Sequence, residues 1–310
     1  MTLLVTGATG HIGYAATMLA ASRGMRVLAL YRDGLIEADA RAVGPNVTWC
    51  ACDLTDAGSA HALLAPHKID ACVHLAAISN EAYARPDPLG AIASNVGATA
   101  NLLDAARTGG WRRFVLVSSG SVFQKRADTR SPIPEDAAPE PANIYATTKY
   151  AAELLTRMYR SEFAVPAATV RISWVFGPPV VSDSPTRGPI PSFLMRALRG
   201  EAVREGGGDF AASFTYIDDV AEGLLAAAAA PTLRFDTYHL GHGVNFSARQ
   251  AAEAVGRACP GAVFELGPGT EPWTRYTAIR GPLAGTPGKR RRDRGRYRAR
   301  RGLPVLRRHG

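Results

Sequence analysis

The sequence predicts an α/β fold with a doubly wound parallel sheet and a smaller C-terminal lobe. In the first half of the chain, short apolar segments of strand length alternate with helical segments. Continuous apolar strands separated by helices are typical of a parallel sheet that is covered on both faces. After residue 170, prolines interrupt the pattern. We therefore expect a sheet domain at 1–170, a lobe at 171–285 from which some segments return to the sheet, and a tail at 286–310.

The hydrophobic pattern predicts five strands in the first half of the chain, and it predicts four helices over the whole chain. The strands are 2–6, 25–31, 46–53, 69–77 and 112–119. The first helix, 11–22, ends before Gly24, and its apolar face is expected to contain Ile12, Ala15, Ala16 and Leu19. The other helices are expected at 89–107, 190–199 and 218–229.

The positive charge of the chain is concentrated at its C-terminal end. The formal net charge is +9, and residues 281–310 contain 11 basic residues and 1 acidic residue, or +10. The other 280 residues therefore carry a net charge of −1. A basic run with an interleaved tyrosine is a usual sign of nucleic-acid binding. The near-neutral body argues against a nucleic-acid partner.

The four cysteines, Cys50, Cys52, Cys72 and Cys259, are too few for a disulfide framework in 310 residues. We expect core thiols, because no further Cys or His lies at a metal-binding spacing. No apolar run reaches the roughly 18 residues of a membrane span. The apolar residues 3–5 lead directly into a glycine-rich turn, unlike a signal peptide. These features predict a cytoplasmic protein with no metal site and no membrane contact.

A glycine-rich loop, TGATGHIG at 6–13, lies between the first strand and the first helix. Glycines at this spacing permit a tight turn, close approach of the backbone to a pyrophosphate and close packing of the helix on the strand. The helix N-terminus then faces the anion. The loop therefore predicts a dinucleotide site on a Rossmann-type sheet. The residues expected to contact the dinucleotide are Gly7, Thr9, Gly10, His11, Ile12 and Gly13, with a solvated turn as the alternative for His11.

The residues after the second and third strands bear on which dinucleotide binds. Arg32 could pair with a 2′-phosphate, which favours NADP, whereas Asp33 could accept hydrogen bonds from ribose hydroxyls, which favours NAD. We expect NADP, with NAD as the alternative. Asp53 is placed to meet the adenine edge with Leu54 beside it. The alternative for Asp53 is to cap the next helix.

The run YATTK at 145–149 places Tyr145 and Lys149 four residues apart, on one face of a helix. A nearby ammonium stabilises phenolate and lowers the pKa of a tyrosine, so that it can exchange a proton with a substrate hydroxyl. Ser119 ends the fifth strand, 26 residues earlier, where an α/β sheet presents its ligand crevice. A hydroxyl there can hold the reacting oxygen.

Taken together, these motifs resemble the extended short-chain dehydrogenase/reductase family, in its NAD-dependent epimerase/dehydratase group. The resemblance covers residues 1 to about 283 and includes CDLTD (52–56), HLAA (74–77), SNVGATANLLDAA (94–106), LVSSGSVF (116–123), RISWVFGPP (171–179) and FTYIDDVAEGL (214–224). It implies that Ser119 and Tyr145 are catalytic and that Lys149 binds the nicotinamide ribose. Asn95 would support the active-site helix or a proton-relay water. Ala76 and Ala77 would border the cofactor.

Candidate substrate contacts follow from the same motifs. Asn80 and Glu81 come after HLAA and are expected to face the active site, and Ser121 follows the strand-end serine. Trp174 is a candidate for the substrate pocket, with core packing as its alternative.

Two departures from the family pattern narrow the activity. Gly120-Ser121 follows Ser119, without the Asp-Glu of the family's dehydratases, which argues against water elimination. Residues 211–213, Ala-Ala-Ser, stand where sugar-nucleotide epimerases carry an Arg that clamps the substrate diphosphate. Arg187 or Arg204 could substitute. A small hydroxy compound is therefore as plausible a substrate as a nucleotide sugar.

The function expected is NAD(P)-dependent oxidation or epimerisation at a secondary alcohol or ketone of a sugar or related small molecule, by a homodimer. A UDP-sugar 4-epimerase is the first alternative. A non-catalytic NADP-sensing regulator is the second, and it is disfavoured because a sensor needs only the glycine loop and not the Ser, Tyr and Lys.

The basic tail departs from the family after RGPLAG (280–285). Residues 286–302 have no periodic apolar face, which predicts a disordered extension. A shift of the reading frame relative to the family is the alternative, since GC-rich DNA read out of frame yields Arg, Gly and Pro.

Overall fold

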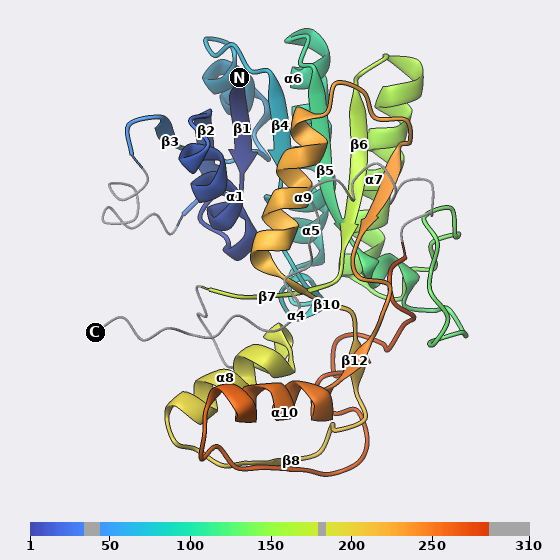
Figure 1. Cartoon of the computed structure of the whole chain (residues 1–310). Coiled ribbons are helices and arrows are strands. Elements are labelled where there is room, and N and C mark those ends of the chain that lie inside the picture. The colour runs from blue at the N-terminus through green and yellow to red at the C-terminus, as the bar shows by residue number, and fades with distance from the viewer. Residues whose placement is uncertain (34–43, 179–183, 285–310) are drawn as a thin grey trace. The chain divides into compact units, whose positions relative to one another are not determined.

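The computed structural model describes residues 1–33, 44–178 and 184–284 (Figure 1). The chain forms two compact units. Unit 1 comprises Met1–Lys125, Ala138–Ile172 and Tyr216–Leu240, within the described residues. Unit 2 comprises Arg126–Ala137, Ser173–Thr215 and the described residues from Gly241 onward. The basic tail lies outside the described residues, so its predicted disorder stays a prediction.

Unit 1 is built on a seven-stranded sheet in the order β11-β6-β5-β4-β1-β2-β3, and every neighbouring pair is parallel. The five predicted strands are confirmed: the first has the predicted bounds, the others are shorter, and the strand expected at 69–77 spans only Ala71–His74. The strands are β1 (Thr2–Thr6), β2 (Arg26–Tyr31), β3 (Val47–Ala51), β4 (Ala71–His74), β5 (Arg113–Ser119), β6 (Ala167–Ile172) and β11 (Thr237–Leu240). The strand order reverses between β1 and β4, and in open α/β sheets ligands bind at the carboxyl ends of the strands at such a point.

Helices cover both faces of this sheet, as the fold class requires. On one face α1 (His11–Ser22) packs against α9 (Ile217–Ala229), and both lie in front of the sheet in Figure 1. The other face carries α3 (Ala57–Leu64), α6 (Ala98–Thr108) and α7 (Ile144–Glu162), which pack against one another in that order. Short segments complete unit 1: α4 (Glu81–Ala84), α5 (Pro88–Ile92), a π-helical segment η1 (Ala93–Gly97) and the 3₁₀ turn η2 (Gly120–Phe123).

Two helix predictions need correction. The buried face of α1 consists of Gly13, Ala16, Thr17 and Ala20, whereas Ile12, Ala15 and Leu19 are only partly buried. At Gly13 the reason is the close approach of the helix to the glycine loop, since a Cβ there would overlap the Gly7 carbonyl oxygen. The single helix expected at 89–107 is interrupted by η1, where the Thr99 hydroxyl donates to the Asn95 carbonyl oxygen and competes with the helical ladder.

The core of unit 1 is apolar and continuous from the sheet to α3, α6 and α7. Its buried members include Leu4, Leu28, Leu102, Phe114 and Leu116.

All four cysteines are free thiols, and Cys72 is fully buried while Cys50 and Cys52 pack against the core. Burial raises the pKa of the Cys50, Cys52 and Cys72 thiols. Within the described residues, no group of three or more His, Cys, Asp or Glu side chains could hold a metal ion.

Unit 2 combines two longer helices with short strand pairs. The helices are α8 (Pro189–Leu198) and α10 (Ala248–Ala258), preceded by the 3₁₀ turn η3 (Pro185–Arg187). The strand pairs are β7 (Trp174–Phe176) with β10 (Phe214–Tyr216), β9 (Ala211–Ala212) with β12 (Phe246–Ser247), and β8 (Val203–Glu205) with β13 (Phe264–Leu266). Aromatic side chains dominate its core, including Phe193, Phe210 and Trp273. None of the helices in the described part of the chain is long and apolar enough to span a membrane.

Candidate active site

The glycine loop joins β1 to α1 at the carboxyl edge of the sheet. Gly7 has a φ of +63°, and a Cβ built on it would lie 2.8 Å from the Ala76 backbone nitrogen. A Cβ on Gly13 would overlap the Gly7 carbonyl oxygen. The loop after β4 therefore lies directly against Gly7, and α1 begins directly against the loop. Side chains at these two positions would force the loop after β4 and the start of α1 away from the glycine loop. The close packing that the glycines permit fits the approach of backbone N–H groups to a pyrophosphate group of a dinucleotide.

The N-terminus of α1 is open to an anion. Gly10 occupies the N-cap without a side-chain hydrogen bond, and the first turn contains no acidic residue. His11 and Ile12 are the first two residues of this turn. The Thr9 hydroxyl donates to the Asp33 carbonyl oxygen (3.1 Å) and ties the loop to the end of β2. The N-terminus of a helix attracts phosphate through its first-turn N–H groups and its dipole.

The remaining cofactor candidates lie at the ends of neighbouring strands. Arg32 and Asp33 follow β2 and form an exposed ion pair, with 3.1 Å between Arg32 Nε and Asp33 Oδ2. Asp53 follows β3 and accepts hydrogen bonds from the Thr55 N–H and hydroxyl, which hold the pKa of its carboxyl below the usual range. The cap of α3 is Asp56, so the alternative reading of Asp53 as this cap is wrong. Leu54, beside Asp53, is buried in the core of unit 1.

The first turn of α7 carries Tyr145. Because α7 connects the parallel strands β5 and β6, it runs against them, and its first turn lies at the carboxyl edge of the sheet. Asn143 caps the helix by accepting the Ala146 N–H (2.9 Å), and the buried Glu81 carboxylate accepts the Tyr145 N–H (3.0 Å). Asn80 caps α4 through the Tyr83 N–H. The structure thus gives Asn80 and Glu81 roles in holding helix ends, and their contact with substrate stays a prediction.

Ser119 lies at the carboxyl end of β5, on the same edge as the glycine loop. It opens η2, and its Oγ accepts the Ser121 N–H and donates to Ser121 Oγ, both at 3.1 Å. Helix α7 packs against both β5 and η2. The structure therefore brings Ser119, Ser121 and Tyr145 to one edge of unit 1.

Lys149 lies one turn after Tyr145 and is 5% exposed. Its burial lowers the pKa of its ammonium to about 8, an effect that the nearby Glu153 carboxylate partly opposes. Glu153 in turn forms a buried ion pair with Arg171 on β6 and accepts a hydrogen bond from the Ser118 hydroxyl (2.6 Å). The protonation of Lys149 thus depends on its low-dielectric surroundings and on the Glu153 carboxylate, whose charge is already paired with Arg171.

Asn95 joins α7 to the loop after β4. Its side chain is 1% exposed, accepts the Ile78 N–H (2.8 Å), and donates to the Ile78 carbonyl oxygen (3.1 Å) and to Thr148 Oγ1 (2.9 Å). The same loop carries Ala76 and Ala77, and the Ala76 N–H donates to the Thr6 hydroxyl (3.1 Å). These contacts agree with a supporting role for Asn95, which stays a prediction as to catalysis.

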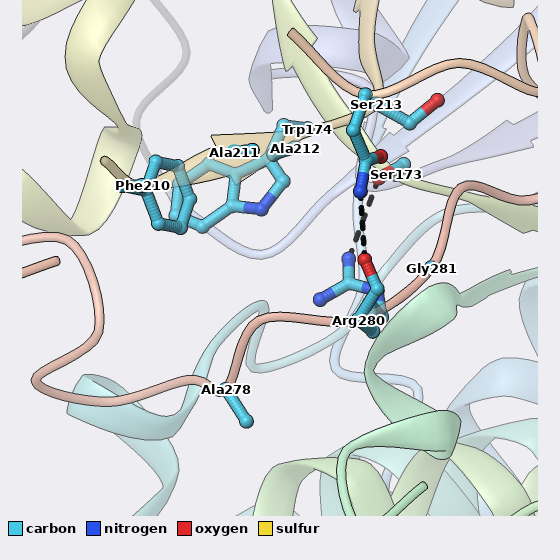
Figure 2. A pocket seen from close by; sticks show the side chains of 10 residues that line it. Ser173, Trp174, Phe210, Ala211, Ala212, Ser213, Ala278, Arg280 and Gly281 are labelled. Atoms are coloured by element: carbon cyan, nitrogen blue, oxygen red, sulfur yellow. Dashed lines mark hydrogen bonds between the residues drawn. The ribbon is translucent and has the colours of Figure 1, made fainter. Parts of the chain in front are cut away.

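Unit 2 contains a narrow hollow that includes Trp174 (Figure 2). The Trp174 and Phe210 rings form an edge-to-face pair at 5.5 Å, and in Figure 2 they lie to one side of Arg280. Arg280 is 7% exposed, and its Nη2 lies 3.4 Å from Ser173 Oγ. Two more polar atoms of the lining, Ser213 Oγ and Asn245 Oδ1, are buried without a hydrogen-bond partner among the described residues. The lining thus combines a buried guanidinium with two buried oxygen atoms beside the apolar core of unit 2.

Sequence reasoning missed Arg280 as a candidate, although the RGPLAG run that contains it was recognised. The two alternatives that it considered lie elsewhere. Arg204 forms an exposed ion pair with Glu265, and Arg187 lies in η3, and neither lines this hollow. Arg280 reaches Ser173 across 107 residues of sequence, and no local spacing reveals such a contact.

The model of the NAD dependent epimerase/dehydratase family matches residues 3–241. The chain belongs to this family. It is therefore an enzyme of the extended short-chain dehydrogenase/reductase type, a dehydrogenase, reductase or epimerase that depends on a nicotinamide cofactor.

Curated relatives and solved structures agree with this assignment. The UDP-glucuronate 4-epimerase of Thermodesulfobacterium geofontis is 29% identical over 82% of this chain and 79% of its own length. The dTDP-4-dehydro-6-deoxy-D-allose reductase of a Streptomyces species is 31% identical over 72% of this chain and 71% of its own length. The Thermus thermophilus UDP-glucose 4-epimerase, solved in complex with NAD, has a TM-score of 0.79 at 24% identity and covers 96% of this chain and 94% of its own. The last of these supports the fold alone.

Proposed function

We propose that this family member oxidises and re-reduces a secondary alcohol of a nucleotide sugar, as a UDP-sugar 4-epimerase does. The observation that carries the proposal is the placement of Tyr145 and Lys149 one helical turn apart on α7, at the sheet edge that also bears the glycine loop and Ser119. A sensor of cofactor needs the loop alone, so this placement disfavours the regulator alternative.

The chain's own residues supply the proton chemistry in this proposal. Tyr145, as phenolate, removes the proton of the substrate hydroxyl and returns it in the reverse direction. The Lys149 ammonium stabilises the phenolate, and the Ser119 hydroxyl holds the reacting oxygen by a hydrogen bond. The bound nicotinamide would accept the hydride from the carbon that carries this oxygen and give it back. Gly7, Gly10, Gly13 and the start of α1 would hold the pyrophosphate.

A nucleotide sugar as substrate is supported by the relatives and by Arg280. The relatives named above act on UDP- or dTDP-linked sugars by their names. The absence of an Arg at 211–213 weakened this substrate class on sequence grounds. We propose Arg280 as the substitute for the missing Arg, because it lines the same hollow of unit 2 as Ala211, Ala212 and Ser213. A guanidinium there could bind a diphosphate in place of the missing side chain.

A reductase of a 4-keto nucleotide sugar is the second candidate, and the 31% identity to the Streptomyces reductase favours it. Both reactions use the same Tyr, Lys and Ser. They differ in whether the ketone stays bound until it is reduced again, which is a property of substrate release. The assay below separates them.

For the cofactor, we propose NADP on the strength of Arg32, with NAD as the alternative through Asp33. The two side chains are paired and exposed, so each is available to a ribose or a 2′-phosphate. Titration of the purified protein with NAD⁺ and NADP⁺ decides between them. If Arg32 reads the phosphate, Arg32→Ala weakens NADP⁺ binding and leaves NAD⁺ binding unchanged. Tighter binding of NAD⁺ by the wild type would overturn the NADP assignment.

A homodimer is also proposed, through the outer faces of α5 and α7. These two helices pack together, and they expose Leu89, Ile92, Leu154 and Met158. An apolar surface of this kind is a usual site of self-association. Sedimentation of the full chain, compared with a Leu89→Lys/Leu154→Lys variant, tests the proposal: a monomeric wild type contradicts it.

The test of the activity is a screen of purified protein with UDP-glucuronate, UDP-glucose and free sugars, in the presence of NAD⁺ or NADP⁺. An epimerase yields the C4 epimer, identified by chromatography, with no net reduced cofactor. A reductase consumes reduced cofactor with a 4-keto nucleotide sugar. Turnover of free sugars or hydroxy acids alone would overturn the substrate class, and binding of a dinucleotide without any turnover would favour the regulator.

A further inference from the structure

His74, the last residue of β4, lies in a hydrogen-bonded chain that none of the chemistry above uses. It is 2% exposed. Its Nδ1 lies 2.7 Å from the Thr6 hydroxyl at the end of β1, and its Nε2 lies 3.1 Å from the Thr99 hydroxyl on α6. The side chain thus links the strand that leads into the glycine loop to a helix on the far side of the sheet.

The hydrogens of this chain can be placed by counting donors and acceptors. Thr6 Oγ1 accepts the N–H groups of Leu75 and Ala76, both at 3.1 Å, so its own proton is left for His74 Nδ1. The Thr99 hydroxyl donates to the Asn95 carbonyl oxygen (2.7 Å) and can only accept from His74 Nε2. The imidazole is therefore neutral, with its single proton on Nε2. Its burial and the nearby Lys149 ammonium lower its pKa to about 3, in agreement with this count.

Asn95 connects this chain to the helix that carries Tyr145: its backbone carbonyl oxygen accepts from Thr99, and its side chain makes the next hydrogen bond. The Asn95 amide donates to Thr148 Oγ1 (2.9 Å), and the Thr148 hydroxyl donates to the Tyr145 carbonyl oxygen (2.9 Å). Thr6, Thr99, Asn95 and Thr148 are all buried. The Asn95 side chain is also held by Ile78 in the loop after β4, to which it donates one hydrogen bond and from which it accepts another. A buried network with all its members satisfied is rigid, and the loss of one member leaves its neighbours unpaired.

We propose that His74 is a positioning residue, which holds the α7 turn of Tyr145 in register with the dinucleotide loop through Thr99, Asn95 and Thr148. The imidazole acts as a fixed two-ended spacer: it accepts at one end from the glycine-loop strand and donates at the other. It touches neither cofactor nor substrate. Its effect on turnover rests on the proposed roles of Tyr145 and Lys149, whereas its tautomer and its hydrogen bonds do not.

The first test is the tautomer, which needs no substrate. The full chain labelled with ¹⁵N-histidine gives one long-range ¹H–¹⁵N pattern for each of its seven histidines. The signal missing in His74→Gln identifies His74. We expect the neutral Nε2–H pattern at every pH from about 5 to 9, well above the value at which this buried ring takes up a proton. A protonated ring in this range, or an Nδ1–H pattern, would overturn the proposal.

The second test uses two threonines with matched substitutions. Thr→Val keeps the shape of the side chain and removes the hydroxyl, whereas Thr→Ser keeps the hydroxyl and removes a methyl group. If hydrogen bonding positions Tyr145, Thr99→Val and Thr148→Val lower kcat about 10-fold or more, and the two Ser variants stay close to the wild type. If the side chains only fill space, the order is reversed, and the proposal fails.

The dinucleotide affinity supplies the remaining readout. Titration of each variant with NAD⁺ and NADP⁺ should show a change of less than about threefold for Thr148→Val, because Thr148 lies at the far end of the chain from the loop. A loss of dinucleotide binding equal to the loss in kcat would indicate general damage to the fold and contradict a positioning role. If the wild type turns over none of the sugars in the screen, the proposed function fails. The tautomer of His74 is measured without substrate and therefore still tests the proposal for His74. Should a Val variant not fold, the tautomer in the corresponding Ser variant, expected to match the wild type, decides the proposal.

Discussion

Glu153 and Arg171 form an ion pair in which each side chain is 1% exposed. Glu153 lies on α7, one helical turn beyond Lys149, and Arg171 lies on β6. The Arg171 Nη2 lies 2.7 Å from Glu153 Oε2, and its Nε contacts both carboxylate oxygens at 3.0 and 3.2 Å. Arg171 also lies over the Phe123 ring, 4.9 Å from the centroid, and its Nη1 lies 3.2 Å from His239 Nε2. A charge pair so deep in unit 1 leaves either partner uncompensated when the other is removed.

We therefore expect Glu153→Gln to lower the free energy of unfolding by about 3–5 kcal/mol, because the Arg171 charge loses its carboxylate. The double variant Glu153→Leu/Arg171→Met should lose much less, since an apolar pair can replace a buried ion pair at little cost. Urea unfolding of the three proteins measures both effects. A single variant as stable as the wild type would show that the pair contributes nothing.

Lys149→Met should stabilise the fold at pH 7 while it abolishes turnover. The ammonium has a pKa of about 8 in the folded chain and 10.5 as its ordinary value, so folding is opposed as long as the unfolded chain holds this proton. The Met variant should be more stable by on the order of 2–3 kcal/mol at pH 7. Between pH 8 and 10.5 the unfolded wild type binds more protons than the folded form, so its stability rises and the difference shrinks.

Urea unfolding at pH 7 and at pH 10 checks this sign. Lys68→Met, at an exposed position, is the matched control for the removal of a lysine side chain. A Met variant whose stability relative to the wild type is the same at both pH values would contradict the lowered pKa.

Tyr145→Phe should reduce turnover by about 10²- to 10⁴-fold, because the phenol is the only group proposed to move the substrate proton. Dinucleotide affinity should stay close to that of the wild type. Tyr150→Phe, on the same helix but outside the proposed machinery, serves as the control. Steady-state turnover and fluorescence titration with NAD⁺ or NADP⁺ separate the two quantities, and near-normal turnover in the Tyr145 variant would refute the mechanism.

Gly13→Ala should abolish dinucleotide binding, because its methyl group would overlap the Gly7 carbonyl oxygen and force α1 away from the loop. Gly256→Ala, on α10, is the comparison, since a Cβ there meets only ordinary contacts near 4 Å with Phe264. Titration calorimetry with both dinucleotides measures the effect, and circular dichroism verifies that each variant is folded. Retention of affinity by the folded Gly13 variant would mean that the pyrophosphate binds elsewhere.

Arg280→Met should raise the KM for a nucleotide sugar by about 10- to 100-fold, the range expected when a charge-assisted contact is lost. Arg204→Met removes a charge that is already paired with Glu265 on the surface and should leave KM unchanged. Initial-rate measurements with UDP-glucuronate or UDP-glucose compare the two variants. Equal effects of both substitutions would show that Arg280 does not hold the diphosphate.

Local patterns were sufficient to predict much of this structure. The parallel sheet could be predicted from the apolar strands, because a strand that is buried on both faces is a continuous apolar run without alternating polar residues. The glycine loop and YATTK could be read because their spacing is local: a loop between a strand and a helix, and one turn of a helix. The same reasoning predicted a buried face of α1 of which only Ala16 is fully buried, since it ranked residues by hydrophobicity, whereas the closeness of helix and loop leaves room for a glycine alone at position 13.

Contacts between distant segments were beyond the reach of sequence patterns. His74 meets Thr6 across 68 residues, Arg171 meets Glu153 from another element, and Arg280 reaches Ser173 across 107 residues. Asn80 and Glu81 were expected beside the substrate, and their visible contacts are with helix ends. Periodicity and spacing express local backbone geometry, and they are therefore sufficient for strands, loops and single helical turns. Buried polar partners are chosen by the packing of the whole chain, because a hydrogen bond must be satisfied by whichever group the fold places within about 3 Å of it.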